Sequence, residues 1–223
     1  MFTLTYNDII NFNQQKLYNQ ATELCHMMLR NRSDKGLSRH NYTTFYDMLF
    51  SKNRQEKLNV FELGMGSADP TIPFYMPGGR VGASHYGWSE YFPNANVYGA
   101  DIDRKTIVDD KAHRVKSYYC DQTNPAVIAD MWANNDLKDL SFDIILEDGL
   151  HEVNANKLFL RQSMHKLKDG GVYIIEDIPF SQFAQYSDLL MECKAKYKFA
   201  ELVTIQGRDP VTVYDNALFV VIK

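Results

Sequence analysis

The chain has 223 residues, a formal charge of −4 at pH 7 and a hydrophobic fraction of 45%. This length suits one domain with a full core, with room for a small helical addition. The mildly acidic balance gives no reason to expect a nucleic-acid partner, and no apolar run approaches the ~18 residues that span a bilayer. The first residues lack the basic and apolar regions of a signal peptide. We therefore expect a cytoplasmic protein, and we expect Cys25, Cys120 and Cys193, which form no CxxC pair, to be reduced thiols.

The first fifty residues differ in pattern from the rest of the chain. Apolar residues at helical spacing predict a helix over residues 7–30, and the polar segment 31–36 ends it. A second helix is expected to start near Asn41. We assign residues 1–50 to an N-terminal helical cap and residues 51–223 to the main domain. The cap could pack on that domain or on a second subunit of a homo-oligomer.

From residue 58 onward, short apolar runs alternate with helical or polar stretches. These runs predict strands at residues 58–63, 96–101, 115–119, 142–147 and 171–176. Nearly continuous apolar runs are typical of strands buried on both faces, as in a parallel sheet with helical crossovers. Residues 151–168 form the clearest crossover helix, which the pattern ends with a glycine C-cap at Asp169-Gly170-Gly171.

The end of the chain predicts a different connection. Two strands at 202–206 and 217–222 flank the polar segment GRDPVTVYDN, which has no room for a helix. They should pair as an antiparallel hairpin. The predicted fold is therefore a doubly wound α/β domain with a seven-stranded, mostly parallel sheet, an antiparallel last strand and N-terminal helices.

A glycine turn follows the first predicted strand. Glu62 ends the strand, and Gly64 and Gly66 let the chain turn sharply and let a ligand approach the backbone. A GxG turn alone is weakly specific. The acidic strand end adds information, because it would repel the pyrophosphate of a dinucleotide but suits a cofactor that carries an ammonium and a sulfonium.

Polar residues also follow the next two strands. Asp101 can accept hydrogen bonds from both hydroxyls of a ribose. Asp121 and Gln122 could read an adenine edge, or they could form a simple turn that caps the next segment. The gap from Gly64 to Asp101 exceeds the usual ~20 residues. We ascribe the excess to a Pro/Gly-rich insertion at residues 68–81, which is either a lid or a surface excursion.

Three carboxylates follow the fourth and fifth strands. Asp148 ends one strand, and Glu176 and Asp177 end its neighbour, so a parallel sheet would bring them together at one edge. The negative charges of neighbouring carboxylates repel one another unless one carboxylate is protonated or a cation lies among them. Oxygen ligands favour a hard ion, Mg²⁺ before others. The alternative is that these acidic residues only cap the following helices.

Taken together, several stretches carry a family resemblance. They are SDKGLSRHNYTTFYDMLF, FELG, GAS, YFPNANVYGADID, CDQT, ILEDGLH and LKDGGVYIIED, in this order over residues 33–177. In this order they resemble the class I S-adenosylmethionine-dependent methyltransferases, and more narrowly the macrocin and mycinamicin type sugar O-methyltransferases. The family's E-L-G-x-x-x-G-x-S run is interrupted here and resumes at Gly82-Ala83-Ser84. Gly66 and Gly82 therefore remain alternatives for the second cofactor glycine.

The resemblance implies an O-methyltransferase that uses S-adenosylmethionine and a divalent cation. Its acceptor would be a hydroxyl of a nucleotide sugar, a polysaccharide precursor or a glycosylated natural product. In the family, the metal is bound by the Asp of D-x-x-H and by the E-D pair of the next strand. The corresponding residues here are Asp148, Glu176 and Asp177. His151, three residues after the catalytic Asp148, is placed to accept a proton from a hydroxyl that a cation makes more acidic. The segment with Lys35, His40 and Tyr42 could close over the cofactor or be a surface helix start.

Three other functions remain as alternatives. The first is an O-methyltransferase for a catechol-like acceptor, which also chelates a cation through adjacent oxygens. The second is a dinucleotide-dependent oxidoreductase, against which Glu62 and the terminal hairpin speak. The third is a non-catalytic cofactor-binding module, against which the retained acidic residues and His151 speak.

Overall fold

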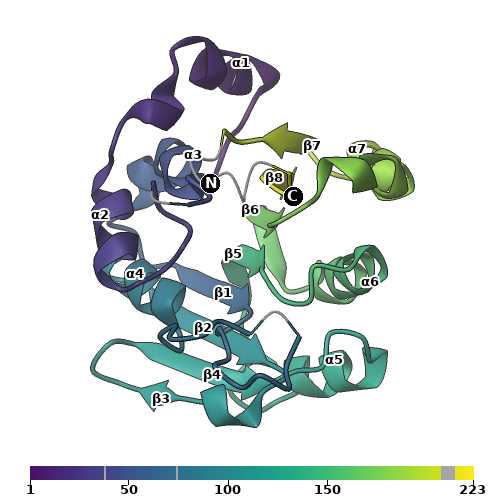
Figure 1. Cartoon of the computed structure of the whole chain (residues 1–223). Helices are drawn as coiled ribbons and strands as arrows, with labels where there is room; N and C mark the ends of the chain where they lie inside the picture. The colour runs from purple at the N-terminus through teal and green to yellow at the C-terminus, as the bar shows by residue number, and fades with distance from the viewer. Residues whose placement is uncertain (38, 74, 207–213) are drawn as a thin grey trace.

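The computed structural model describes residues 1–37, 39–73, 75–206 and 214–223. Within them, a sheet with the strand order β3-β4-β2-β1-β5-β6-β8-β7 runs through the centre of the molecule (Figure 1). Its strands are β1 (Asn59–Leu63), β2 (Asn96–Asp101), β3 (Asp109–Asp110), β4 (Val115–Tyr119), β5 (Phe142–Glu147), β6 (Leu167–Ile175), β7 (Phe199–Thr204) and β8 (Ala217–Ile222).

The strand directions confirm the predicted fold class. Neighbouring strands in the series β4-β2-β1-β5-β6 pair in parallel. Strand β8 runs antiparallel to both β6 and β7. The two-residue β3, antiparallel to β4, is an eighth strand that the sequence did not predict. The chain winds outward from β1 to β2 and β4, then returns to β5 on the other side of β1. This reversal between β1 and β5 is the place where doubly wound sheets bind ligands.

Helices cover both faces of the sheet (Figure 1). Alternate strand residues explain this, since Val60 and Ile144 belong to one hydrophobic core and Phe61 and Ile145 to the other. The first face carries α1 (Tyr6–Gln14), α2 (Glu23–Arg30), α3 (Tyr42–Phe50) and α4 (Ala83–Tyr91); the second carries α5 (Pro125–Trp132), α6 (Val153–Ser163) and α7 (Ser187–Lys196). Short 3₁₀ turns lie at Leu17–Asn19, Ser51–Asn53, Arg104–Thr106 and Phe180–Tyr186.

The N-terminal segment differs from the prediction in one respect. The prediction of a single helix over residues 7–30 is wrong, because this segment forms two helices, α1 and α2, with a break between them. Lys16 has a left-handed φ of 51°, and the Thr22 hydroxyl caps the new helix by accepting from the Cys25 N–H at 3.3 Å. The second helix does begin at Tyr42, as expected. Phe12, Met28 and Phe45 share a core with the sheet, so the N-terminal helices pack on it. The division at residue 50 stays a prediction.

The predicted glycine C-cap after residue 168 is also wrong. Helix α6 ends at Ser163, and β6 begins at Leu167, so the two glycines lie inside a strand. Gly170 has a φ of +76°, close to the shift in register between β5 and β6. Its carbonyl accepts from the Phe2 N–H at 3.0 Å. A glycine with positive φ therefore serves a strand irregularity here instead of a helix end.

The C-terminal hairpin is present, with β7 at Phe199–Thr204 instead of 202–206. Most of its connecting segment, residues 207–213, lies outside the described residues. All three cysteines are free and buried. No helix among the described residues has the length and apolarity required to cross a bilayer. A cytoplasmic location stays a prediction.

Candidate functional site

A cavity of about 550 Å³ opens at the carboxyl ends of the central strands, where β1 and β5 meet. Most of the predicted site residues line it: Gly64, Gly66, Ser84, Asp101, Asp121, Gln122, Asp148, His151 and Asp177. Glu62, Gly82 and Glu176 are not among its lining residues. The sheet edge therefore brings the predicted residues together, with three exceptions that need a local explanation.

The glycine turn forms one wall of this cavity. Gly64 has a φ of +99°, and a Cβ atom there would lie 2.0 Å from the carbonyl oxygen of Asp148, so no other residue fits. The Asp101 carboxylate holds the turn by accepting from the Met65 N–H at 2.7 Å and from the Asp103 N–H at 2.8 Å. Burial raises the pKa of Asp101, although these two N–H groups act in the opposite direction. The backbone of the turn and the Asp101 carboxylate thus line the cavity together.

The residues after β4 have different roles. Asp121 accepts from the Thr123 N–H at 2.9 Å, which is the simple turn that the sequence left as an alternative, yet it also lines the cavity. The Gln122 amide is used inside the protein. Its oxygen accepts from the Leu150 N–H at 2.7 Å, and its nitrogen donates to Glu147 at 3.0 Å. Gln122 therefore fixes the loop after β5.

Glu62 lies on the opposite side of β1 from the position that the sequence suggested. Its neighbours Phe61 and Leu63 point to the second face, so strand alternation sends Glu62 toward α4. Its carboxylate accepts from the Ser84 hydroxyl at 2.6 Å and from the Trp88 indole N–H at 2.5 Å. Glu62 is fully buried and supports the cavity wall from behind.

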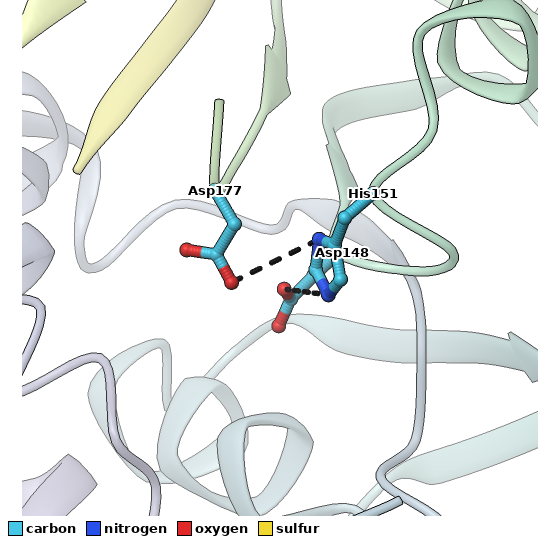
Figure 2. Close-up of side chains that lie close together, drawn as sticks. All are labelled: Asp148, His151 and Asp177. Atoms are coloured by element: carbon cyan, nitrogen blue, oxygen red, sulfur yellow. Dashed lines mark ion pairs between the residues drawn. The ribbon is translucent and has the colours of Figure 1, made fainter. Parts of the chain in front are cut away.

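Asp148, His151 and Asp177 form a group that could hold a metal ion, with one ligand atom from each lying within 4.8 Å of the others. Figure 2 shows the imidazole with one ring nitrogen toward each of the two carboxylates. The Nδ1 atom of His151 is 3.8 Å from Oδ2 of Asp177, and its Nε2 is 4.0 Å from Oδ1 of Asp148. Ligand atoms about 2.1 Å from one Mg²⁺ lie roughly 3–4 Å from one another, so the spacing fits a cation.

The backbone is strained at two members of this group. His151 has a φ of 57° and Asp177 a φ of 54°, both in the left-handed region that residues with a side chain rarely adopt. Such strain persists only where neighbouring contacts hold it, and it is concentrated at functional sites. At Asp177 the holding contact is the Tyr42 hydroxyl, which donates to Oδ1 at 2.7 Å.

Lys35 is central to this cluster, although the sequence placed it only in a segment that could close over the cofactor. Its Nζ lies 2.5 Å from both Oδ2 of Asp148 and Oε2 of Glu176, and 3.3 Å from Glu62. The Tyr46 hydroxyl donates to the second oxygen of Glu176 at 2.6 Å. Both oxygens of Glu176 are thus bonded inside the protein, which explains why this residue does not reach the cavity.

The charges of this cluster follow from its contacts. Burial would lower the pKa of Lys35, but Asp148, Glu176 and Glu62 raise it well above its ordinary value. Burial would raise the pKa of Asp148, but Lys35 and His151 lower it. Lys35 is therefore an internal cation at neutral pH, and Asp148 is its ionised partner.

The N-terminal segment closes over the site. Lys35, His40 and Tyr42 are buried, so the alternative of a surface helix start is wrong. The Nδ1 atom of His40 lies 3.2 Å from Oδ1 of Asp177 and 3.0 Å from the amide oxygen of Asn216. The stretch SDKG…HNY in the sequence was the signal for these contacts, although it did not show which partners they have.

The insertion at residues 68–81 forms another wall of the cavity. Ile72, Pro73, Tyr75, Met76 and Arg80 line it. Asp69 pairs with Lys105 after β2 at 2.6 Å, and Arg80 donates to Asn31 at 2.6 Å. The insertion is thus tied to both sides of the cavity and is more than a surface excursion.

The chain is similar in sequence to known sugar O-methyltransferases over part of its length. The chain is 33% identical over 143 residues to the mycinamicin VI 2''-O-methyltransferase of Micromonospora griseorubida, covering 62% of this chain and 32% of the relative. It is 30% identical over 167 residues to the 8-demethyl-8-alpha-L-rhamnosyl tetracenomycin-C 2'-O-methyltransferase of Streptomyces olivaceus, covering 73% and 39%. The chain thus spans well under half the length of these relatives. No family model matches it.

The solved structures decide the fold. The MycE methyltransferase of the mycinamycin biosynthetic pathway, solved with Mg and SAH, superposes with a TM-score of 0.67 at 22% identity. The match covers 92% of this chain and 55% of that one. This chain has the class I methyltransferase fold and resembles the macrocin and mycinamicin type sugar O-methyltransferases. The cavity lies where the strand order of the sheet reverses, the place where doubly wound sheets bind ligands, and it is lined by Asp101 and by the group of Asp148, His151 and Asp177.

Proposed function

We propose that this chain is an S-adenosylmethionine-dependent O-methyltransferase that uses a divalent cation and methylates a hydroxyl of a sugar or sugar-containing small molecule. The observation that carries the proposal is one cavity lined by Asp101, by the glycine turn, and by the group of Asp148, His151 and Asp177. The names of the relatives, which are O-methyltransferases of glycosylated compounds, support the acceptor class.

The cofactor would occupy the part of the cavity over β1, β2 and β4. Asp101 would accept the ribose hydroxyls, Asp121 would face the adenine, and the turn from Gly64 to Gly66 would lie against the methionine part. Gly66 lines the cavity and Gly82 does not, which favours Gly66 as the second cofactor glycine. Ser84 would line the cofactor part of the cavity, and Glu62 would act from behind the wall by accepting the Ser84 hydroxyl hydrogen bond.

Replacing Asp101 with asparagine should weaken binding of S-adenosylhomocysteine by about 1–3 kcal/mol, because hydroxyl groups lose a charged partner. Titration calorimetry measures this change. Asp103→Asn is the matched control, since Asp103 is buried two residues away but does not line the cavity. Equal affinities for both variants and the wild type would remove Asp101 from the cofactor site.

The cation would be held by Asp148 and Asp177, with Mg²⁺ the best match to carboxylate ligands. When bound, it would lower the pKa of an acceptor hydroxyl. Lys35 keeps Asp148 ionised, and Tyr42 fixes the direction of Asp177. Glu176 would have to leave Lys35 and Tyr46 to join them.

His151 would serve as the general base. Its ring would accept the proton of the acceptor hydroxyl, and the cavity would hold that oxygen toward the methyl group of the bound cofactor. When bound, S-adenosylmethionine would supply the methyl group, and neutral S-adenosylhomocysteine would be the product. The carboxylates of Asp148 and Asp177, each about 4 Å from one ring nitrogen, would stabilise the resulting imidazolium.

Removal of divalent cations should abolish methyl transfer. We would incubate the protein with methyl-labelled S-adenosylmethionine and Mg²⁺, offering a panel of glycosides and catechol as acceptors. A glycoside should become labelled, EDTA should stop the reaction, and excess Mg²⁺ should restore it. Full transfer in EDTA would refute the cation requirement. Transfer to catechol and to none of the glycosides would favour the catechol-type acceptor.

The insertion should become more protected from hydrogen exchange when the cavity fills. Residues 68–81 contribute a wall but have few buried anchors, so ligand contacts should slow their exchange. Exchange is compared with and without S-adenosylhomocysteine and Mg²⁺. Residues 134–140, which do not line the cavity, serve as the internal reference. If protection of residues 68–81 does not change when the ligands bind, the insertion is a fixed wall of the cavity and does not act as a lid.

A further inference from the structure

Two residues that line the cavity each carry a side-chain oxygen that is buried and has no hydrogen-bond partner. Among the described residues, Oε1 of Gln182 and Oδ1 of Asp215 have no donor, and both residues line the cavity. Asn41 and Tyr173 carry the other such atoms, and neither residue lines the cavity. Because buried acceptors without donors are unfavourable, the pair calls for a ligand that supplies hydrogens.

The two residues come from segments that lie side by side. Gln182 is in the 3₁₀ turn after β6, and Asp215 lies two residues before β8. The Phe180 N–H donates to the Tyr214 carbonyl at 3.0 Å, and the Ile178 N–H donates to the Ala217 carbonyl at 3.1 Å. These backbone bonds fix the two segments, so the pair is a built part of the cavity wall.

The pair also borders the candidate cation site. Asn216, next to Asp215, bonds His40 at 3.0 Å, and His40 lies 3.2 Å from Asp177. Along the edge of the sheet, the proposed cofactor residues follow β4, β2 and β1, and the cation residues follow β5 and β6. The end over β6 and β8 remains for the acceptor.

We propose that Gln182 and Asp215 bind the acceptor sugar by accepting hydrogen bonds from two ring hydroxyls other than the one that is methylated. This inference rests on the proposed function and names the chemistry that its acceptor must have. Both unpartnered atoms are acceptors, so they select a ligand rich in hydroxyl donors. A catechol places both of its hydroxyls at the cation and has none left for this pair, whereas a pyranose carries further hydroxyls around its ring.

The test uses the whole protein loaded with S-adenosylhomocysteine and Mg²⁺. Methyl α-L-rhamnopyranoside, methyl α-D-glucopyranoside and catechol are the probes, followed by NMR titration. Asp215→Ala should weaken the binding of a glycoside about 10-fold or more, and Gln182→Leu about 3–10-fold, because a charged acceptor contributes more than a neutral one. Gln182→Glu, which keeps an acceptor oxygen, is the matched control.

Two further readouts separate the outcomes. Catechol and S-adenosylhomocysteine should bind the variants as they bind the wild type, which also shows that the variants are folded. A deoxy glycoside that lacks the hydroxyl bound by the replaced residue should bind the variant and the wild type with equal affinity. Glycoside affinities that stay within about 2-fold, or a wild type that binds S-adenosylhomocysteine but neither glycoside, would overturn the inference. A wild type that does not bind S-adenosylhomocysteine would refute the proposed function itself.

Discussion

Replacing His151 with alanine should lower the turnover of methyl transfer about 10²–10⁴-fold, the usual contribution of a positioned general base. The imidazole lies 3.8 Å from Asp177 and 4.0 Å from Asp148, where an acceptor hydroxyl near the cation would meet it. The loss should be in kcat, with the affinity for S-adenosylhomocysteine unchanged. Initial rates with an acceptor glycoside and calorimetry with S-adenosylhomocysteine measure the two quantities.

The pH profile gives this prediction a second readout. Burial would lower the pKa of His151, but Asp177 and Asp148 raise it. Because a protonated imidazole cannot accept a proton, wild-type turnover should fall as the pH decreases, and this limb should vanish in His151→Ala. His165→Ala is the control, since His165 is exposed and does not line the cavity. A His151→Ala protein with full turnover and an intact cation requirement would reject the base.

Replacing Lys35 with methionine should destabilise the fold by about 3–5 kcal/mol, because it leaves buried carboxylates without their cation. Lys35 contacts Asp148, Glu176 and Glu62, and its side chain is only 2% exposed. Methionine keeps most of the side-chain volume, so the lost charge should account for most of the effect. Urea unfolding measures the free energy, and Lys57→Met, at an exposed position, is the matched control.

The pH dependence of this effect has a defined sign. Lys35 lowers the pKa of Asp148, so the contribution of Asp148 to stability is present at neutral pH and is lost as the pH falls through its lowered pKa. The difference between wild type and Lys35→Met should therefore narrow in acid. The second substitution Glu176→Gln should restore part of the lost stability. A Lys35→Met protein within about 1 kcal/mol of the wild type would contradict the internal-cation role.

The sheet could be predicted because its strands are short apolar runs buried on both faces. The positions of Asp148 and Asp177 followed from the same argument, since parallel strands end at one edge. The break at Lys16 was not predictable from periodicity, because apolar residues keep helical spacing across it. Gly170 was misassigned for a related reason: a positive φ suits both a helix end and a strand irregularity.

The orientation and partners of single side chains were the main limit of the sequence. Glu62 was expected in the cavity, but it faces Ser84 and Trp88 on the α4 side of β1. Lys35 contacts Asp148 across 113 positions of sequence, and no local pattern predicts such a contact. Gln182 and Asp215 were missed too, because only the folded chain shows that their oxygens lack donors.

A crystal grown with S-adenosylhomocysteine and Mn²⁺ tests the central proposal, that a methyl donor and a cation meet in this cavity. Anomalous scattering locates the Mn²⁺ independently of the fitted coordinates. We expect the ribose of S-adenosylhomocysteine at Asp101 and an anomalous peak within about 2.3 Å of carboxylate oxygens of Asp148 and Asp177. An occupied cofactor site with no anomalous peak at these carboxylates would contradict the proposed cation site. A cavity without S-adenosylhomocysteine would contradict the proposed methyltransferase function itself.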